Sequence, residues 1–91
     1  AARFLSEGHV TVPVLVRSER REELLDAAVT VRAEAPEADG RLRLEVTFQD
    51  LRHAEWAMWR LGTDAEALAP EALRAALRDR AAALAARYEA A

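Results

Sequence analysis

The sequence has 91 residues, 52% of them hydrophobic and 32% charged, so it suits one small domain and leaves no room for a second. A domain of this size can build one core but not a large enclosed active-site cavity as well, which counts against a self-sufficient enzyme. Thirteen arginines against sixteen acidic residues give a net charge of −3, so the overall basic field typical of nucleic-acid-binding proteins is absent and any such binding must be local.

The first eight residues have the composition of a linker. Only two large apolar residues, Phe4 and Leu5, precede Glu7, which predicts neither a signal peptide nor a membrane span. We therefore expect a linker over residues 1–8 and a single domain over residues 9–91, located in the cytoplasm. Because the chain lacks an initiating Met, we also expect it to be part of a longer protein.

A strand is predicted over residues 9–17, because valines occupy every second position from Val10 to Val16. Ser18 follows where a helix N-cap oxygen is needed, and three glutamates fall in the first turns, where the helix dipole favours anions. The sequence thus predicts a helix that runs from Ser18 to about Ala28.

A hairpin is predicted over residues 29–48. Apolar and polar residues alternate from Val29 to Ala35, and Pro36 and the Asp39-Gly40 pair then signal a turn. The second arm is the clearest strand in the chain, with one core face and one solvent face. Its apolar face consists of Leu42, Leu44, Val46 and Phe48.

Two further helices are predicted, with a short strand between them. Asp50 can cap the first helix, and Gly62 ends it. The strand covers residues 65–69, and Pro70 suits the first position of a final helix that ends near Glu89. The apolar positions are Leu51, Ala54, Met58 and Leu61 in the first helix and Leu73, Leu77, Leu84 and Tyr88 in the second.

The resulting order, β-α-β-β-α-β-α, predicts an α+β fold of the ferredoxin-like, split βαββαβ class with an additional C-terminal helix. In this fold a four-stranded antiparallel sheet carries two helices on one face, and the first and third strands are central. Pro13 conflicts with a central position, because proline removes a ladder donor. We expect a β-bulge at Pro13 to resolve this conflict.

The segment from Gly40 to Tyr88 resembles the C-terminal extension (WCX) domain of WYL-domain bacterial transcriptional regulators. The resemblance rests on the Gly-led alternating strand, the Trp-bearing helix that closes in WAMWRLG at residues 56–62, the LAPEALR segment at residues 68–74 and a late Tyr. It covers about half of the chain well and Val10–Arg17 more loosely. The order and spacing of these features, more than any one of them, make it specific.

The resemblance implies a regulatory role. Proteins of this family carry an N-terminal winged-helix DNA-binding domain, a central WYL domain that senses single-stranded nucleic acid or a nucleotide-like ligand, and a C-terminal domain that supports dimerisation and completes the ligand site. The implied partners are the WYL domain of the same chain, a second copy and single-stranded nucleic acid, without a membrane. The WYL triplet does not occur here, so no ligand-binding residue is carried over.

Three arginines are candidate ligand contacts on the polar face of the sheet. Arg41 and Arg43 lie on one predicted strand, and Arg32 lies beside them on the preceding strand. Guanidinium groups present rigid forks of donors that suit phosphates. The alternative is a solvated face with ordinary cross-strand Arg–Glu pairs, since Glu34 and Glu45 are interspersed. The outward positions carry no aromatic platform for base stacking, which argues against autonomous sequence-specific RNA binding.

The two tryptophans differ in position on their predicted helix. At about 100° per residue, Trp59 falls near the edge of the apolar stripe and Trp56 well outside it. Trp56 is therefore predicted to be an exposed aromatic residue at a subunit or domain interface, or else to pack on the final helix. Packing is the favoured interpretation for Trp59.

No catalytic or metal site is predicted, and no cofactor. His9 and His53 lack the spacing of metal ligands, and Ser6 and Ser18 lack a nucleophile motif. The chain has neither Cys nor Asn, so disulfides, thiolate metal sites and the Arg/Asn chemistry of acylphosphatase-like enzymes are excluded.

The sequence therefore predicts a noncatalytic regulatory domain that supports dimerisation and ligand sensing. A pure oligomerisation or docking module without ligand contact is the alternative. A small-molecule sensor that pairs sheets side by side fits the fold but no particular residue.

Overall fold

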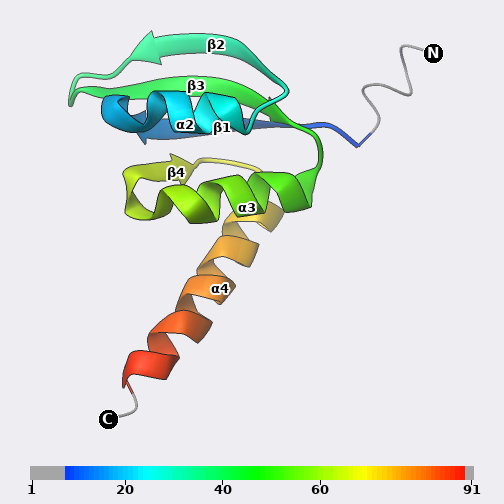
Figure 1. The fold of residues 1–91 in the computed structure, drawn as a ribbon, viewed down its shortest axis with the longest axis vertical. Coiled ribbons are helices and arrows are strands. Elements are labelled where there is room, and N and C mark those ends of the chain that lie inside the picture. Colours follow the sequence, from blue (N-terminus) through cyan, green and yellow to red (C-terminus); the bar gives the residue numbers. More distant parts are fainter. Residues whose placement is uncertain (1–7, 90–91) are drawn as a thin grey trace.

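The computed structural model describes residues 8–89, so the predicted linker over residues 1–8 lies outside the described residues except for Gly8. The elements follow the predicted order (Figure 1). They are strand β1 (Val10–Arg17), the 3₁₀ turn η1 (Ser18–Arg20), helix α2 (Arg21–Asp26), strands β2 (Thr30–Pro36) and β3 (Arg41–Phe48), helix α3 (Leu51–Leu61), the 3₁₀ turn η2 (Gly62–Asp64), strand β4 (Ala65–Ala67) and helix α4 (Glu71–Glu89).

The four strands form one antiparallel sheet in the order β2-β3-β1-β4. The first and third strands are central, as the sequence predicts, because their valines and leucines face a common core. Val12 lies opposite Val46 and Val14 opposite Leu44 in the β1–β3 ladder. All four side chains are fully buried, so alternation of apolar and polar residues determines which face of each strand is covered.

Helices α2 and α3 cover the apolar face of the sheet (Figure 1). Leu24 is the one fully enclosed side chain of α2, while α3 contributes its predicted stripe, including Met58 and Leu61. These side chains join those of β1 and β3 in a single core. The opposite sheet face carries no helix within residues 8–89.

Pro13 is accommodated without the predicted bulge. The β1–β3 register is continuous through Pro13, which lies opposite Glu45. The Pro13 carbonyl accepts from the Leu68 backbone N–H at 2.8 Å, so it points toward the β4 side. Because the nitrogen and carbonyl of a residue in an antiparallel strand point to the same neighbour, the prolyl nitrogen faces the end of β4, and the β1–β3 ladder loses no donor.

The bulge lies instead in β2, where the register shifts between Val31 and Ala33. Val31 pairs with the buried Val46, but Ala33 and Ala35 pair with Glu45 and Arg43 on the opposite face. The predicted alternation from Val29 to Ala35 is therefore wrong beyond Val31. The extra residue reverses the faces, as a β-bulge does.

The two predicted helix caps have different outcomes. Asp50 caps α3 as expected, because its Oδ1 accepts from the His53 backbone N–H at 2.7 Å. The predicted cap at Ser18 is wrong, since Ser18 begins the 3₁₀ turn and its hydroxyl lies near the Glu19 carboxylate. Gly62 ends α3 with φ 59° and ψ −128°, a conformation that side chains disfavour.

Helix α4 projects away from the rest of the domain (Figure 1). Its first turns pack on α3 and β4 through the buried Leu73 and the half-buried Leu77, and beyond them Arg80 still reaches Trp59 of α3. From Arg78 to Glu89 every residue is exposed, so the predicted apolar face is covered for only half its length. No helix within residues 8–89 has the length and apolar character needed to cross a membrane.

Candidate functional site

The sheet face without helices is the first candidate site. It is called here the open face, and it is formed by the outward side chains of β1 and β3 with those of the edge strands. Alternation places arginines near one end of it and threonines at the other. Its central residues are Thr11, Pro13, Leu15 and Arg17 of β1 and Arg41, Arg43, Glu45 and Thr47 of β3.

Arg17 and Arg41 lie directly opposite each other in the β1–β3 ladder. Like charges in this position repel, and each guanidinium is offset by its own carboxylate. Arg41 Nε lies 2.8 Å from Asp39 Oδ2, while Arg17 lies 3.5 Å from Glu19 and 3.9 Å from Asp64. The contacts of Arg17 are long and its side chain is mostly exposed, so the nearby carboxylates neutralise its charge only weakly.

The Asp39 carboxylate is tied to the hairpin turn as well as to the guanidinium. Its pKa is lowered from the usual value, first by the hydrogen bond from the Arg41 backbone N–H and then by the bond from the Arg41 side chain. Asp39 thus remains a carboxylate at neutral pH and holds Arg41 against the turn. An incoming anion would have to compete with it for Arg41.

Arg43 is the freer of the two predicted β3 arginines. It is exposed and lies opposite Leu15 on β1 and Ala35 on β2, neither of which is charged. Within residues 8–89 it makes no ion pair. A shallow hollow of about 190 Å³ between β2 and β3 lies beside it and is lined also by Ala33 and Glu45. A guanidinium in this setting can bind an anion without first breaking a salt bridge.

Arg32 does not join the other two arginines in the ladder. It is the extra residue of the β2 bulge, with no partner across from it in β3, and it lies exposed at the edge of the sheet. The structure therefore brings Arg41 and Arg43 onto one face and adds Arg17, which the sequence reasoning missed. The outward position of Arg17 follows from the alternation of β1, but its place opposite Arg41 depends on a register that the sequence does not reveal.

The open face has no aromatic side chain among its described residues, as expected. Base stacking is thus not available there, and recognition would depend on charge and hydrogen bonds. Within residues 8–89 no group of three or more His, Asp or Glu side chains could hold a metal ion.

Trp56 is exposed as predicted, with 46% of its surface accessible. Its ring stacks on His53 at a centroid distance of 5.7 Å, and the Arg60 guanidinium lies 4.8 Å from the ring centroid. Because His53 precedes and Arg60 follows Trp56 on α3, the indole is held between them.

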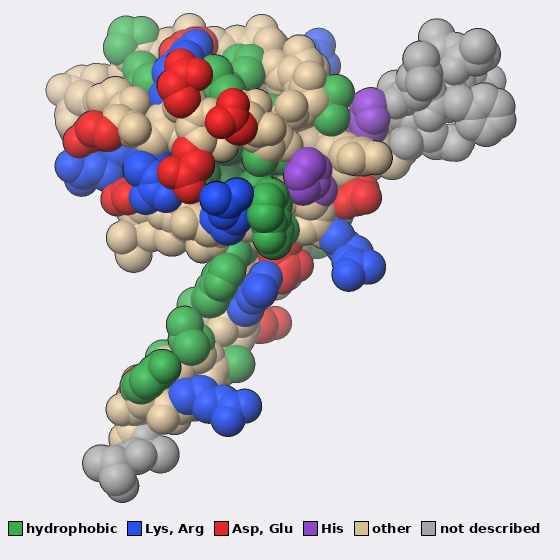
Figure 2. Space-filling model, in the orientation of Figure 1, with side chains coloured by type: hydrophobic (Ala, Val, Ile, Leu, Met, Phe, Trp, Pro, Cys, Tyr) green, Lys and Arg blue, Asp and Glu red, His purple; other side chains and the backbone are tan. Residues whose placement is uncertain are grey.

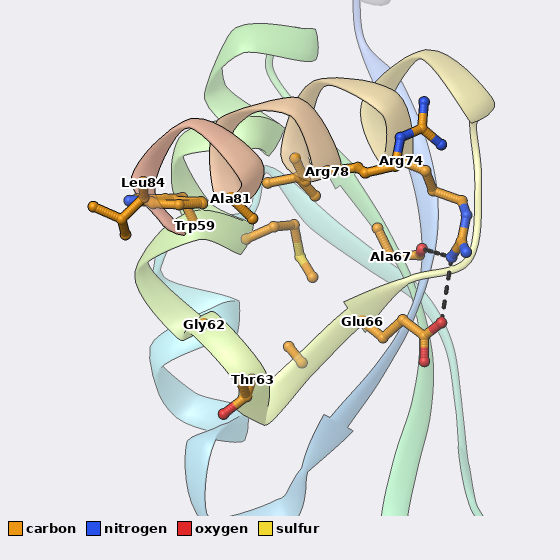
Figure 3. A pocket seen from close by; sticks show the side chains of 12 residues that line it. Trp59, Gly62, Thr63, Glu66, Ala67, Arg74, Arg78, Ala81 and Leu84 are labelled. Atoms are coloured by element: carbon orange, nitrogen blue, oxygen red, sulfur yellow. Dashed lines mark hydrogen bonds and ion pairs between the residues drawn. The ribbon is translucent and has the colours of Figure 1, made fainter. Parts of the chain in front are cut away.

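Trp59 packs beside the final helix, as favoured from the sequence, and lines the second candidate site. The Arg80 guanidinium of α4 lies 4.7 Å from the Trp59 ring centroid, and Arg80 also reaches Glu55 at 3.4 Å. Between α3, β4 and α4 is a groove of about 700 Å³ (Figure 3). Its lining is mostly apolar and includes Met58, Trp59, Ala67, Leu77 and Leu84.

Two arginines lie at the rim of this groove. Arg74 donates to the Ala67 carbonyl at 2.7 Å and lies 3.3 Å from Glu66, which fixes it against β4 (Figure 3). Arg78 has only long contacts, 3.9 Å to Glu71 and 3.8 Å to Asp79. The groove thus combines an apolar floor with a positive rim, a composition suited to an amphipathic partner.

The comparison with protein families identifies the family of this domain. The WCX domain model matches residues 8–85, from the start of the described structure into α4. A search of curated proteins found no relative that matches this sequence. The family match includes β1, which the resemblance noted in the sequence covered only loosely. Because it spans most of the chain, the protein belongs to the WCX domain family, which is associated with WYL regulators.

Proposed function

We propose that this chain is the noncatalytic C-terminal regulatory domain of a WYL-type transcriptional regulator in the cytoplasm. It supports dimerisation and, with a WYL domain of the same protein, contributes to a site for single-stranded nucleic acid or a nucleotide-like ligand. The WCX family is associated with regulators and is not a known catalytic family. The strand order, with β1 and β3 central, supports a ferredoxin-like classification of the module.

The observation that carries the ligand proposal is the arginine arrangement on the open face. Arg17 and Arg41 face each other, and Arg43 lies two residues along β3 on the same side without an ion pair in residues 8–89. A phosphate beside them would relieve the repulsion between like charges and receive several charge-assisted hydrogen bonds. Arg32 on the edge strand would extend this surface toward the ligand backbone.

The net charge of −3 gives the domain no general attraction for nucleic acid. A phosphate ligand therefore needs the local arginines, and a second domain must supply base contacts. We assign this role to the WYL domain, because the open face offers no aromatic platform of its own.

The experiment is fluorescence anisotropy of a short labelled single-stranded DNA, titrated with the domain at low and moderate salt. We expect salt-sensitive binding that the Arg41→Ala/Arg43→Ala variant weakens by roughly tenfold or more. The matched control is Arg52→Ala/Arg60→Ala, which removes the same charge from exposed positions of α3, on the side of the sheet opposite the open face. Equal losses in both variants would show a charge effect only, and absence of binding at low salt would overturn the ligand role of the isolated domain.

The alternative is a pure oligomerisation or docking module, favoured by the exposed apolar surface around α4 and by Trp56. Light scattering on the eluate of a sizing column, with the wild-type chain and Trp56→Ala, tests the interface prediction for this tryptophan. A dimer that Trp56→Ala leaves unchanged would remove Trp56 from the interface.

A further inference from the structure

We propose that two copies of this chain form a symmetric dimer in which their α4 helices pack antiparallel, each covering the groove of the other. The inference rests on the dimerisation proposed above and assigns its interface. The contact surface is called the α4 seam. It consists of Leu77, Ala81, Leu84 and Tyr88, whose spacings of four, three and four residues place them on one side of a helix.

The α4 seam is apolar and uncovered along its outer half (Figure 2). Leu84 is 48% exposed and Tyr88 84% exposed, although both continue the line of the half-buried Leu77. Most of the stability of a helix in a protein comes from packing of its apolar side against other elements. Every residue from 78 to 89 is nevertheless exposed, and a partner helix would cover the apolar side of this outer half.

The groove and the seam form one continuous surface, because Leu77, Ala81 and Leu84 belong to both. Met58 and Trp59 of α3 border it on the other side (Figure 3). One molecule therefore presents a protruding helix next to a groove. Such a surface can pair with itself across a two-fold axis, since the helix of each copy enters the groove of the other.

Charges on the flank of the seam favour an antiparallel pair. The helical period places Arg74, Arg78 and Glu89 on the same flank. When Leu77 lies opposite Tyr88 of the second copy, Glu89 of that copy is level with residue 76, between Arg74 and Arg78. The negative end of its helix dipole lies there as well. The positive rim of the groove thus meets the negative end of the other α4.

The other flank carries Arg80 and Arg87, which would approach each other across the pair. The charge of Arg80 is already shared with Glu55 and the Trp59 ring, so this approach is partly offset. A parallel pair would set Arg78 of one copy beside Arg80 of the other and lose the contact to Glu89. The charges therefore select the antiparallel arrangement.

Analytical ultracentrifugation over a range of protein concentrations tests the proposal. We expect a monomer–dimer equilibrium whose Kd rises by roughly tenfold or more in Leu84→Glu/Tyr88→Glu. The matched control is Ala82→Glu/Ala86→Glu, which adds the same charges to the opposite side of α4 and leaves the Kd unchanged. Circular dichroism checks that both variants keep their helix content.

A charge exchange tests the orientation. Glu89→Arg should weaken the dimer, and combining it with Arg78→Glu should restore it, because Arg78 has only long contacts within its own chain. A wild-type chain that stays monomeric, a dimer insensitive to Leu84→Glu/Tyr88→Glu, or equal weakening by the control would each overturn the α4 interface. If a dimer persists in the seam variant, dimerisation stands and only the interface is wrong. The DNA titration tests the ligand role separately.

Discussion

Arg21 of α2 and Glu34 of β2 form a two-pronged ion pair, with Nε to Oε2 at 2.7 Å and Nη2 to Oε1 at 2.8 Å. The pair ties the short helix to the edge strand. It exists because the bulge at Arg32 turns Glu34 to the helix side of the sheet, where Glu34 lies opposite the buried Leu44. Without the extra residue, Glu34 would face the opposite side and Arg21 would lose its partner.

This ion pair makes the free energy of unfolding depend on pH in the acidic range. The Arg21 side chain holds the pKa of Glu34 below its usual value of 4.5, because its hydrogen bonds favour the carboxylate. A depressed folded pKa stabilises the fold fully above pH 4.5, and this stabilisation is lost as the pH falls from there through the folded pKa. We expect urea unfolding free energies to fall less steeply below pH 4.5 in Glu34→Gln than in the wild type.

The matched control is Glu45→Gln on the open face, where the carboxylate has no ion pair within residues 8–89. Glu23 and Asp39 also have lowered pKa values through their arginine partners, so Glu34→Gln should flatten the acid slope only in part. An unchanged slope in Glu34→Gln would contradict the assignment.

Leu73 anchors α4 to the domain, since it is the one fully buried side chain of that helix. We expect Leu73→Ala to lower the free energy of unfolding by about 2–5 kcal/mol, because it removes buried methyl groups and leaves a cavity. Leu84→Ala removes the same atoms from an exposed position and should change it by less than about 0.5 kcal/mol in dilute monomer. Chemical denaturation of both variants measures these free energies. Similar losses in Leu73→Ala and Leu84→Ala would mean that the outer half of α4 is packed.

Gly62 permits the sharp turn from α3 into η2. An added Cβ would meet no atom within 4 Å, so any cost of a side chain comes from the backbone angles alone. We expect Gly62→Ala to destabilise the fold by about 1–3 kcal/mol, and Thr63→Ala at the next exposed position by much less. Thermal unfolding measures both. A neutral Gly62→Ala would show that the turn relaxes without cost.

The contact between Arg80 and Trp59 joins α4 to α3. A double-mutant cycle with Arg80→Leu and Trp59→Leu should give a coupling free energy of about 0.5–1 kcal/mol, as for exposed cation–π pairs. Arg78→Leu, two residues earlier on α4 and without a described contact to the ring, should show no coupling with Trp59→Leu.

Strands β1 and β3 were predictable because burial on one face imposes a strict alternation of large apolar and polar residues. In β2 the same pattern was misleading. Ala33 and Ala35 are small enough to be exposed at little cost in free energy, so an apolar residue at these positions did not indicate burial. One unpaired residue, Arg32, then reversed the face, and no local sequence signal marks it.

The same limit applies to the candidate site. Arg41 and Arg43 were placed on one face correctly because they alternate with buried leucines on a single strand. Arg17 was missed, and the unpaired position of Arg32 was not foreseen, because the relation of both residues to β3 depends on pairing register between segments distant in sequence. The projection of α4 was also not predictable, since its apolar positions suggest packing along the whole helix whether the partner is internal or external.

The bulge in β2 also hinders the addition of further strands at that edge of the sheet. β2 is an edge strand, and an unbroken edge offers its free backbone groups to a strand of any other molecule. Here the row of groups is interrupted at Arg32, and Pro36 supplies no N–H at the end of the strand. The other edge strand, β4, is three residues long, and its Ala67 carbonyl accepts a hydrogen bond from the Arg74 side chain. Both borders are thus poor templates for strand-by-strand addition of a second molecule.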